Sequence, residues 1–478
     1  MLPVDLKLLI NGRWTNGTAG HREPVFNPAD EEVIGELPFA SDADIDEALA
    51  ASLDGFRVWR VTPAIQRQAV MEKAAMLMAE RKETIARILT MEMGKALAES
   101  RAEVDFVIGV TRWYGEEGKR AYGRLIPPRA PDVRQIVHKE PVGPVCAFVA
   151  WNFPGTNFIR KVAGALGAGC SIVIKPSEET PGTAIAIAQC FQDAGLPDGV
   201  LNLVFGIPSA VSERILQSPI PRKLSFTGSV PVGKHLQKLA ADTLKRTTME
   251  LGGHAPVIVC DDADLDRTLD TMVPFKYRNA GQVCISPTRF IVQDGLYDRF
   301  VDGFVQRANA IQVGNGLEDG VQMGPLIAAR RQTVMESFVE DATRRGAKLL
   351  SGGERIGNRG YFFAPTVLAD VPHDAEIMRE EPFGPVAPIV RFADLDEAIG
   401  IANSVTVGLA SYAFTADPKR AARLSAELNA GMVGINNPGV STPETPFGGV
   451  DESGYGSEGG IEGLEAFLRT KFVSETYI

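Results

Sequence analysis

One of the five cysteines differs from the others in its surroundings. Cys284 ends the polar, glycine-containing run Asn-Ala-Gly-Gln-Val-Cys, whereas the other four lie within or beside apolar runs: Cys146, Cys170, Cys190 and Cys260. A buried free thiol is usually inert, so we expect those four in the core. A thiol in a polar turn can act as a nucleophile, which makes Cys284 the candidate for covalent catalysis.

Two further polar groups are expected at strand ends, where doubly wound folds place their ligands. Glu250 precedes Gly252 and Gly253. It could be a general base with a raised pKa, or a carboxylate that loop amides satisfy. Asn152 follows an apolar run and could donate to a developing oxyanion, although a turn-forming asparagine beside a proline is the simpler alternative.

Two segments have the residue types that hold a nucleotide. Residues 175–178, Lys-Pro-Ser-Glu, present a cation and a carboxylate that suit ribose hydroxyls, although an ion pair beside helix-capping residues would look the same. Residues 226–234 run from a predicted strand into a glycine-rich helix start, whose amides could bind an anion. His235 stands where a P-loop needs Ser or Thr, so this segment does not predict an NTPase.

Short β-branched runs alternate with helical patterns, and these elements must position the polar groups. One series of strands is predicted near residues 145–150, 171–175, 200–204 and 223–226, and a second near 256–260, 288–292, 386–392, 411–414 and 431–436. A capping box at Ser41 and Asp44 and a helical stretch from Pro63 to about Lys119 precede them. This alternation is typical of parallel, doubly wound sheets and favours two α/β domains.

Composition excludes several classes of protein. The 49 Lys and Arg against 60 Asp and Glu give a net charge of −11, which disfavours nucleic acid as a partner. The five cysteines lack CxxC spacing, so neither a disulfide framework nor a zinc site is expected, and we predict no metal. The N-terminus does not resemble a signal peptide and no apolar stretch is long enough for a membrane span, so we expect a cytoplasmic protein without a membrane partner.

Several segments together resemble the aldehyde dehydrogenase superfamily in order and spacing. They are residues 151–154, 175–178, 226–233, 250–253, 281–284, 381–385 and 446–449. The resemblance implies an aldehyde dehydrogenase-like α/β fold with a Rossmann-like cofactor domain, a catalytic domain and a small β oligomerisation arm. The implied boundaries are 1–122 with 142–250 for the NAD-binding domain, 251–443 for the catalytic domain, and 123–141 with 444–478 for the arm and C-terminal segment.

The same resemblance assigns the catalytic roles. Cys284 would attack the aldehyde carbon, and the Asn152 side chain with the Cys284 backbone amide would hold the oxyanion. Glu250 would then activate water to hydrolyse the thioester. The implied cofactor is NAD, with NADP possible, and the implied assembly is a homodimer or homotetramer that takes a small aldehyde.

The resemblance also implies the cofactor-binding residues. Lys175 and Glu178 would hold the adenosine ribose, Gly228 and Ser229 the pyrophosphate, and Glu381 the nicotinamide ribose. The remaining residues of the predicted cofactor site are Trp151, Pro176, Ser177, Gly233, Leu251 and Phe383. We expect NAD in preference to NADP, because a carboxylate at position 178 would repel a 2′-phosphate.

Three positions are similar to the succinate-semialdehyde dehydrogenase branch, where they grip the substrate carboxylate: Arg160, Arg278 and Ser441. Each also has a plain structural interpretation. Arg160 and Lys161 could form a solvated helix face, Arg278 a charge at a helix end, and Ser441 a turn. Two guanidinium groups and a hydroxyl near one thiol favour a carboxylate pocket.

The main hypothesis is therefore oxidation of succinate semialdehyde to succinate. A dehydrogenase for another ω-carboxylated or general small aldehyde is the alternative within the family. A CoA-acylating enzyme would not need the base at Glu250, and a catalytically silent protein on this scaffold would not need Cys284, Asn152, Glu250 and Glu381 together.

Overall fold

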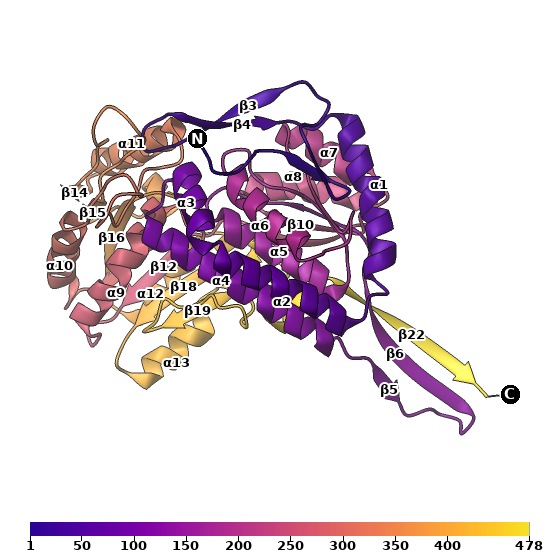
Figure 1. Ribbon diagram of the computed structural model, residues 1–478. Helices are drawn as coiled ribbons and strands as arrows, with labels where there is room; N and C mark the ends of the chain where they lie inside the picture. Colours follow the sequence, from indigo (N-terminus) through magenta and orange to yellow (C-terminus); the bar gives the residue numbers. More distant parts are fainter. Residues whose placement is uncertain (478) are drawn as a thin grey trace.

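Two α/β sheets and a projecting β arm make up the fold of the computed structural model, which describes residues 1–477 (Figure 1). The first sheet has the strand order β2-β1-β9-β8-β7-β10-β11-β21. Its strands are β1 (Leu8–Ile10), β2 (Arg13–Thr15), β7 (Val145–Phe148), β8 (Ile172–Lys175), β9 (Leu201–Leu203), β10 (Lys223–Thr227), β11 (Arg246–Glu250) and β21 (Gly454–Tyr455).

The centre of this sheet is parallel, as predicted, from β9 through β8, β7 and β10 to β11. All residues of β7 and β8 are buried, because helices cover both faces of a parallel sheet. The strands at its edges, β1, β2 and β21, are antiparallel and were not predicted. The helices that follow the central strands are α5 (Pro154–Ala168), α6 (Pro181–Asp193), α7 (Pro208–Gln217) and α8 (Val230–Ala241).

The N-terminal part is helical, with α1 (Asp42–Trp59), α2 (Ala64–Glu80), α3 (Lys82–Met93) and α4 (Leu97–Glu117). Ser41 and Asp44 form the predicted capping box at the start of α1. The stretch predicted as helical after Pro63 is divided into three helices. Gly94 ends α3 in the left-handed conformation, with φ 90°, which a side chain would disfavour.

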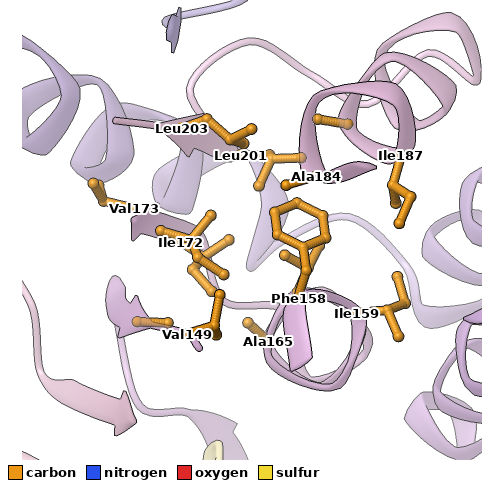
Figure 2. Close-up of a cluster of buried hydrophobic side chains, with 14 of the residues drawn as sticks. Val149, Phe158, Ile159, Ala165, Ile172, Val173, Ala184, Ile187, Leu201 and Leu203 are labelled. Carbon is orange, nitrogen blue, oxygen red and sulfur yellow. The ribbon is translucent and has the colours of Figure 1, made fainter. Parts of the chain in front are cut away.

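Hydrophobic packing fixes the first sheet between its helices. Figure 2 shows the Phe158 ring of α5 pointing toward Ala184 of α6 and Leu201 of β9. The other labelled side chains come from the same layers: Val149, Ile159, Ala165, Ile172, Val173, Ala184, Ile187, Leu201 and Leu203. This packing fixes the positions of the carboxyl ends of the strands, where the polar residues lie.

The second sheet has the order β14-β15-β16-β13-β12-β18-β19, and only β14 runs antiparallel to its neighbour. Its strands are β12 (Ala255–Val259), β13 (Pro287–Gln293), β14 (Lys348–Ser351), β15 (Thr366–Ala369), β16 (Val386–Phe392), β18 (Ala410–Phe414) and β19 (Met432–Ile435). The helices around it are α9 (Leu265–Tyr277), α10 (Tyr297–Asn309), α11 (Ala329–Arg344), α12 (Leu395–Ala402) and α13 (Pro418–Glu427).

The projecting arm consists of β5 (Arg124–Ile126), β6 (Val133–Pro141) and β22 (Leu468–Thr476), and it points away from both sheets (Figure 1). β22 pairs along the whole of β6 and forms an edge of the arm. The remaining elements are β3 (Arg22–Phe26), β4 (Val33–Pro38), β17 (Val407–Gly408), β20 (Val450–Asp451) and α14 (Gly460–Glu465). No helix among residues 1–477 combines the length and apolar character needed to cross a membrane.

Candidate active site

A cavity of about 350 Å³ lies where segments associated with the two sheets meet. The three predicted substrate residues line it, as do Cys284 and Glu250. Asn152 accepts a hydrogen bond from Asn157, which also lines it. Segments far apart in the sequence therefore converge here: the starts of α4 and α5, the end of β11, the turn after α9, and residues 438–447. Across residues 1–477, no group of three or more His, Cys, Asp or Glu side chains is placed to hold a metal ion.

Cys284 is the one cysteine of the chain that is not fully buried, all five being described by the structure. A turn with left-handed backbone at Asn279 and Ala280 delivers it, with φ 49° and 52°. Gly281 follows, and a Cβ there would lie 2.2 Å from the Gly384 carbonyl oxygen. Burial, with a contribution from the Glu381 carboxylate, raises the pKa of the Cys284 thiol to about 12. The resting thiol is therefore protonated at neutral pH.

Asn152 has its amide group fixed in orientation by two neighbours. Its Nδ2 donates to the Gln282 carbonyl oxygen at 3.2 Å, and its Oδ1 accepts from Asn157 Nδ2 at 3.2 Å. The first bond ties the amide to the residues that precede Cys284. One of the two N–H groups on Nδ2 is left to donate to a substrate oxygen.

Glu250 ends β11, and its carboxylate is buried. Among the described residues neither of its side-chain oxygens has a hydrogen-bond partner. Burial, with the nearby Glu458 carboxylate, raises the pKa of Glu250 well above its ordinary range. A carboxyl with a raised pKa and no competing donor is suited to take a proton from water.

A buried lysine that the sequence did not single out as functional lies close to Glu250. Lys161 Nζ donates to Glu458 Oε1 and to Thr227 Oγ1. The alternative that Arg160 and Lys161 form a solvated face is wrong, because their exposures are 4% and 0%. The signal available in the sequence was a pair of cations inside the glycine- and alanine-rich segment that follows Asn152.

A second group missed by the sequence analysis holds the loops that carry Asn152 and Cys284. Lys95 Nζ donates to Glu103 Oε2 at 2.6 Å and to the Asn152 carbonyl oxygen at 3.0 Å. Glu103 Oε1 accepts from the amides of Gly155 and Thr156, at the start of α5.

Glu99 completes this group, which we name the α4 clamp: Lys95, Glu99 and Glu103. It accepts from the Asn279 amide at 3.0 Å. Burial raises the pKa of Glu99 to about 7. Glu99 and Glu103 lie four residues apart on one face at the start of α4, and Lys95 lies just before the helix, a spacing that was present in the sequence.

The predicted substrate residues come together in the cavity. Arg160 donates from Nη2 to Ser441 Oγ at 2.8 Å, which joins α5 to the loop after β19. Arg278 follows α9 and lines the same cavity as Cys284. The interpretations of Ser441 as only a turn residue and of Arg278 as only a helix-end charge do not account for this convergence.

Most of the predicted cofactor residues follow strands of the first sheet, at their carboxyl ends. Glu381 and Phe383 are the exceptions, because they lie in the segment that precedes β16 of the second sheet. Lys175 Nζ and Glu178 Oε1 form an ion pair at 2.5 Å, with Lys175 buried among Pro176 and Ser177. Trp151 packs edge-on against Phe383, with ring centroids 5.5 Å apart. Burial raises the pKa of Glu381 to about 8.

The start of α8 fits a pyrophosphate. Ser229 caps the helix without a side-chain hydrogen bond, and its first turn has no acidic residue. Pro231 has no N–H and the Gly233 amide donates to the Ser229 carbonyl oxygen, so the Val230 and Val232 amides are the ones at this end without an intrahelical partner for an anion to use. The Gly228 amide is bonded to the Glu250 carbonyl oxygen at 3.1 Å, which ties this loop to β11. A Cβ at Gly233 would lie 2.5 Å from the Leu251 side chain, so the helix packs closely on the strand end.

Comparison with known proteins agrees with this geometry. The model of the aldehyde dehydrogenase family matches residues 14–473. A 4-(hydroxymethyl)benzenesulfonate dehydrogenase of Comamonas testosteroni is 49% identical over 98% of this chain and 97% of its own length. A glutarate-semialdehyde dehydrogenase of Pseudomonas putida is 42% identical over 97% of this chain and 96% of its own.

A solved structure is equally similar. The succinate-semialdehyde dehydrogenase of Burkholderia pseudomallei has a TM-score of 0.98 and 40% identity, covering 99% of this chain and 98% of that chain. Similarity of this extent confirms the predicted fold class and the predicted family. The chain belongs to the aldehyde dehydrogenase family, whose members oxidise aldehydes with NAD or NADP.

Proposed function

We propose that this chain oxidises an aldehyde with an anionic group at its far end, such as succinate semialdehyde, to the carboxylic acid. The observation that carries the proposal is the presence of two guanidinium groups, Arg160 and Arg278, in the cavity that Cys284 lines. Charge-assisted hydrogen bonds from arginine to a carboxylate are strong and directional. An uncharged aldehyde would leave both cations without an anion.

Catalysis begins at the thiol. The S–H bond of Cys284 breaks with release of its proton to water, and Sγ bonds to the aldehyde carbon as the C=O double bond becomes a single bond. The negative charge that develops on the oxygen is stabilised by the free N–H of Asn152 and by the Cys284 backbone amide. NAD or NADP, when bound, would supply the two-electron acceptor needed for oxidation of this adduct to a thioester.

Glu250 acts in the second half of the reaction. It removes a proton from a water molecule, whose oxygen then attacks the thioester carbonyl. The C–S bond breaks, the carboxylic acid leaves and the thiol is restored. A base next to the thioester favours hydrolysis over transfer to CoA.

Names of the relatives support an anionic substrate. Those quoted above contain a benzenesulfonate and the semialdehydes of glutarate and succinate, each of which has a sulfonate or carboxylate group. These molecules share the anionic group but differ in carbon skeleton.

NAD is the proposed cofactor. The α8 start would hold the pyrophosphate, Glu381 the nicotinamide ribose, and the Lys175–Glu178 pair the adenosine ribose. The Glu178 carboxylate can accept from a 2′-hydroxyl and repels a 2′-phosphate.

A matched pair of aldehydes tests the proposed substrate. Succinate semialdehyde and butyraldehyde have the same number of carbons, and only the first has a carboxylate. We expect kcat/KM to be roughly 100-fold higher for succinate semialdehyde, the equivalent of about 2.7 kcal/mol, measured by the absorbance of the reduced cofactor. Equal values would show that the arginines are structural, and the family assignment would be unaffected.

A further inference from the structure

Four phenylalanine rings and the two cavity arginines are interleaved. The Arg160 guanidinium carbon lies 3.9 Å from the ring centroid of Phe447 and 5.3 Å from that of Phe106. The Arg278 guanidinium carbon lies 4.1 Å from the ring centroid of Phe275 and 6.0 Å from that of Phe153. All four rings line the cavity. Each cation is therefore held against aromatic surface.

Both guanidinium groups have unused donors. Within residues 1–477, Nε of Arg160 and Nε of Arg278 are buried and have no hydrogen-bond partner. A buried N–H without a hydrogen-bond partner is unfavourable, so an anion that accepts a hydrogen bond from it would bind with a more favourable free energy. The cations are consequently positioned for an anionic group that enters the cavity.

The rest of the wall is apolar, and this feature is not explained by a short aliphatic substrate. Val283, Ile285, Leu409 and Val440 continue the surface that the four rings begin. The backbone of succinate semialdehyde has only two methylene groups to contact this surface. A flat aromatic ring would bury far more apolar area and could pack offset or edge-on against the phenylalanines.

Phe275 is the best-defined of the rings. It packs edge-on against Tyr412, with centroids 5.6 Å apart and an interplanar angle of 82°. Tyr412 is itself held by a hydrogen bond from its hydroxyl to the Ile285 carbonyl oxygen, at 2.8 Å. The Phe275 ring therefore contacts Tyr412 on one side and the Arg278 guanidinium on another, and its remaining surface lines the cavity.

We propose that the preferred substrates are benzaldehydes with a carboxylate or sulfonate group at the opposite end of the ring, and that Phe275 determines this preference. The inference rests on the proposed function, because the reaction at the aldehyde is the same and the ring and the anionic group take no part in it. The aldehyde carbon meets Cys284, the ring lies among the phenylalanines, and the anion binds Arg160 and Arg278.

A panel of aldehydes tests this assignment: para-formylbenzoate, para-formylbenzenesulfonate, benzaldehyde, succinate semialdehyde and butyraldehyde. We expect the better of the two anionic benzaldehydes to exceed succinate semialdehyde in kcat/KM by about 10-fold or more. The comparison between the carboxylate and the sulfonate identifies which anion the site prefers. If succinate semialdehyde is the better substrate, the inference is overturned while the proposed function stands.

The opposite failure has a different signature. If benzaldehyde matches both anionic benzaldehydes and butyraldehyde matches succinate semialdehyde, the proposed function itself fails, because the anion then contributes nothing.

Phe275→Ser separates specificity from structure. We expect it to lower kcat/KM for the anionic benzaldehydes by roughly 30-fold, and for succinate semialdehyde by only about 3-fold, the smaller share that comes from loosening Arg278. Phe56→Ser is the matched control, since Phe56 is also half-buried and also lies under an arginine, with Arg60 at 5.5 Å, but it does not line this cavity. An equal loss for all substrates would make Phe275 merely structural and would overturn its assignment.

Discussion

Cys284 and Glu250 line one cavity but act in different halves of the proposed reaction, and variants of the two should differ accordingly. Cys284→Ala should abolish turnover and still bind cofactor, because the nucleophile is lost and the cofactor residues remain. Glu250→Gln should give a rapid burst of reduced cofactor, about one per active site, and then stall. Stopped-flow absorbance measures both. A Glu250→Gln variant with undiminished steady-state turnover would remove this residue from the mechanism.

The raised pKa of Glu250 predicts a pH dependence. The carboxyl can accept a proton from water only in its ionised form, so kcat should rise with pH as that form is populated. Because burial raises the pKa of Glu250, the rise should lie well above the pH at which an exposed glutamate ionises. A kcat profile under conditions where hydrolysis limits the rate checks this. A flat profile across the acidic and neutral range would contradict the assigned base.

Glu178 should govern the choice between NAD and NADP. We expect kcat/KM to favour NAD by about tenfold, or 1.4 kcal/mol, a modest ratio because Lys175 offsets part of the negative charge. Glu178→Ser should reduce the ratio of kcat/KM for NAD to kcat/KM for NADP. Glu179→Ser is a matched control, since Glu179 is paired with the exposed Arg330. A wild-type preference for NADP would refute the assignment.

At this scale the sequence predicted the groups that belong to recognisable motifs and missed the buried charges that only pair in the folded chain. Cys284, Glu250 and Asn152 stand at predicted strand ends or in glycine-containing turns, where motif order and spacing identify them. Lys161 and Glu458 are paired across the fold, and only tertiary packing shows that two distant charges are buried together. The roles of all these residues stay predictions until variants are measured.

At the scale of elements, the α4 clamp connects the N-terminal helices to the catalytic loops. Lys95→Met would leave the Glu103 carboxylate buried without its cation and the Asn152 carbonyl without a donor. We expect the free energy of unfolding to fall by about 3 kcal/mol. We also expect kcat to fall more than KM rises, because the oxyanion donor is displaced. Chemical denaturation and steady-state kinetics measure the two effects.

The chain offers a control for this change. Lys82 pairs with Asp105 at 2.6 Å, the same distance as Lys95 with Glu103, but at the surface. Lys82→Met should therefore cost less than about 1 kcal/mol and leave kcat unchanged. Equal effects of the two substitutions would mean that the clamp has no positioning role.

Sequence patterns located the interior elements better than the peripheral ones. Continuous apolar runs predicted the central strands, since both faces of a parallel sheet are covered. The outer antiparallel strands β1, β2 and β21 are two or three residues long, and β1 and β21 join the sheet by pairing with segments distant in the chain. The break between α3 and α4 lies at Gly94, inside the stretch that was predicted as helical from Pro63 to about Lys119.

At the scale of the whole molecule, the arm exposes apolar side chains. Leu125, Ile136 and Val473 lie in one row across its three strands, and Leu125 is 69% exposed. We propose that this row is covered in a homodimer or homotetramer. Leu125→Asp should shift the sedimentation coefficient to that of a smaller species. Ser474→Asp should not, because Ser474 follows Val473 in β22 and its side chain therefore lies on the other face of the arm. An unchanged coefficient for Leu125→Asp would exclude this face as a contact.

Topology at this scale was predictable from the alternation of strands and helices, and the resemblance added the arm. The boundaries at residues 122, 142, 250 and 443 stay a prediction. The cavity itself could not be derived from periodicity, because residues from α4, α5, β11 and the turn before Cys284 meet only in the folded chain.

Trapping the covalent intermediate tests the central claim most directly. Glu250→Gln mixed with cofactor and an anionic aldehyde should gain the mass of one acyl group, and peptide mass spectrometry should place it on Cys284. The double variant Cys284→Ala, Glu250→Gln should gain none. An acyl group on another residue, or reduced cofactor formed without any covalent adduct, would contradict oxidation through a Cys284 thioester.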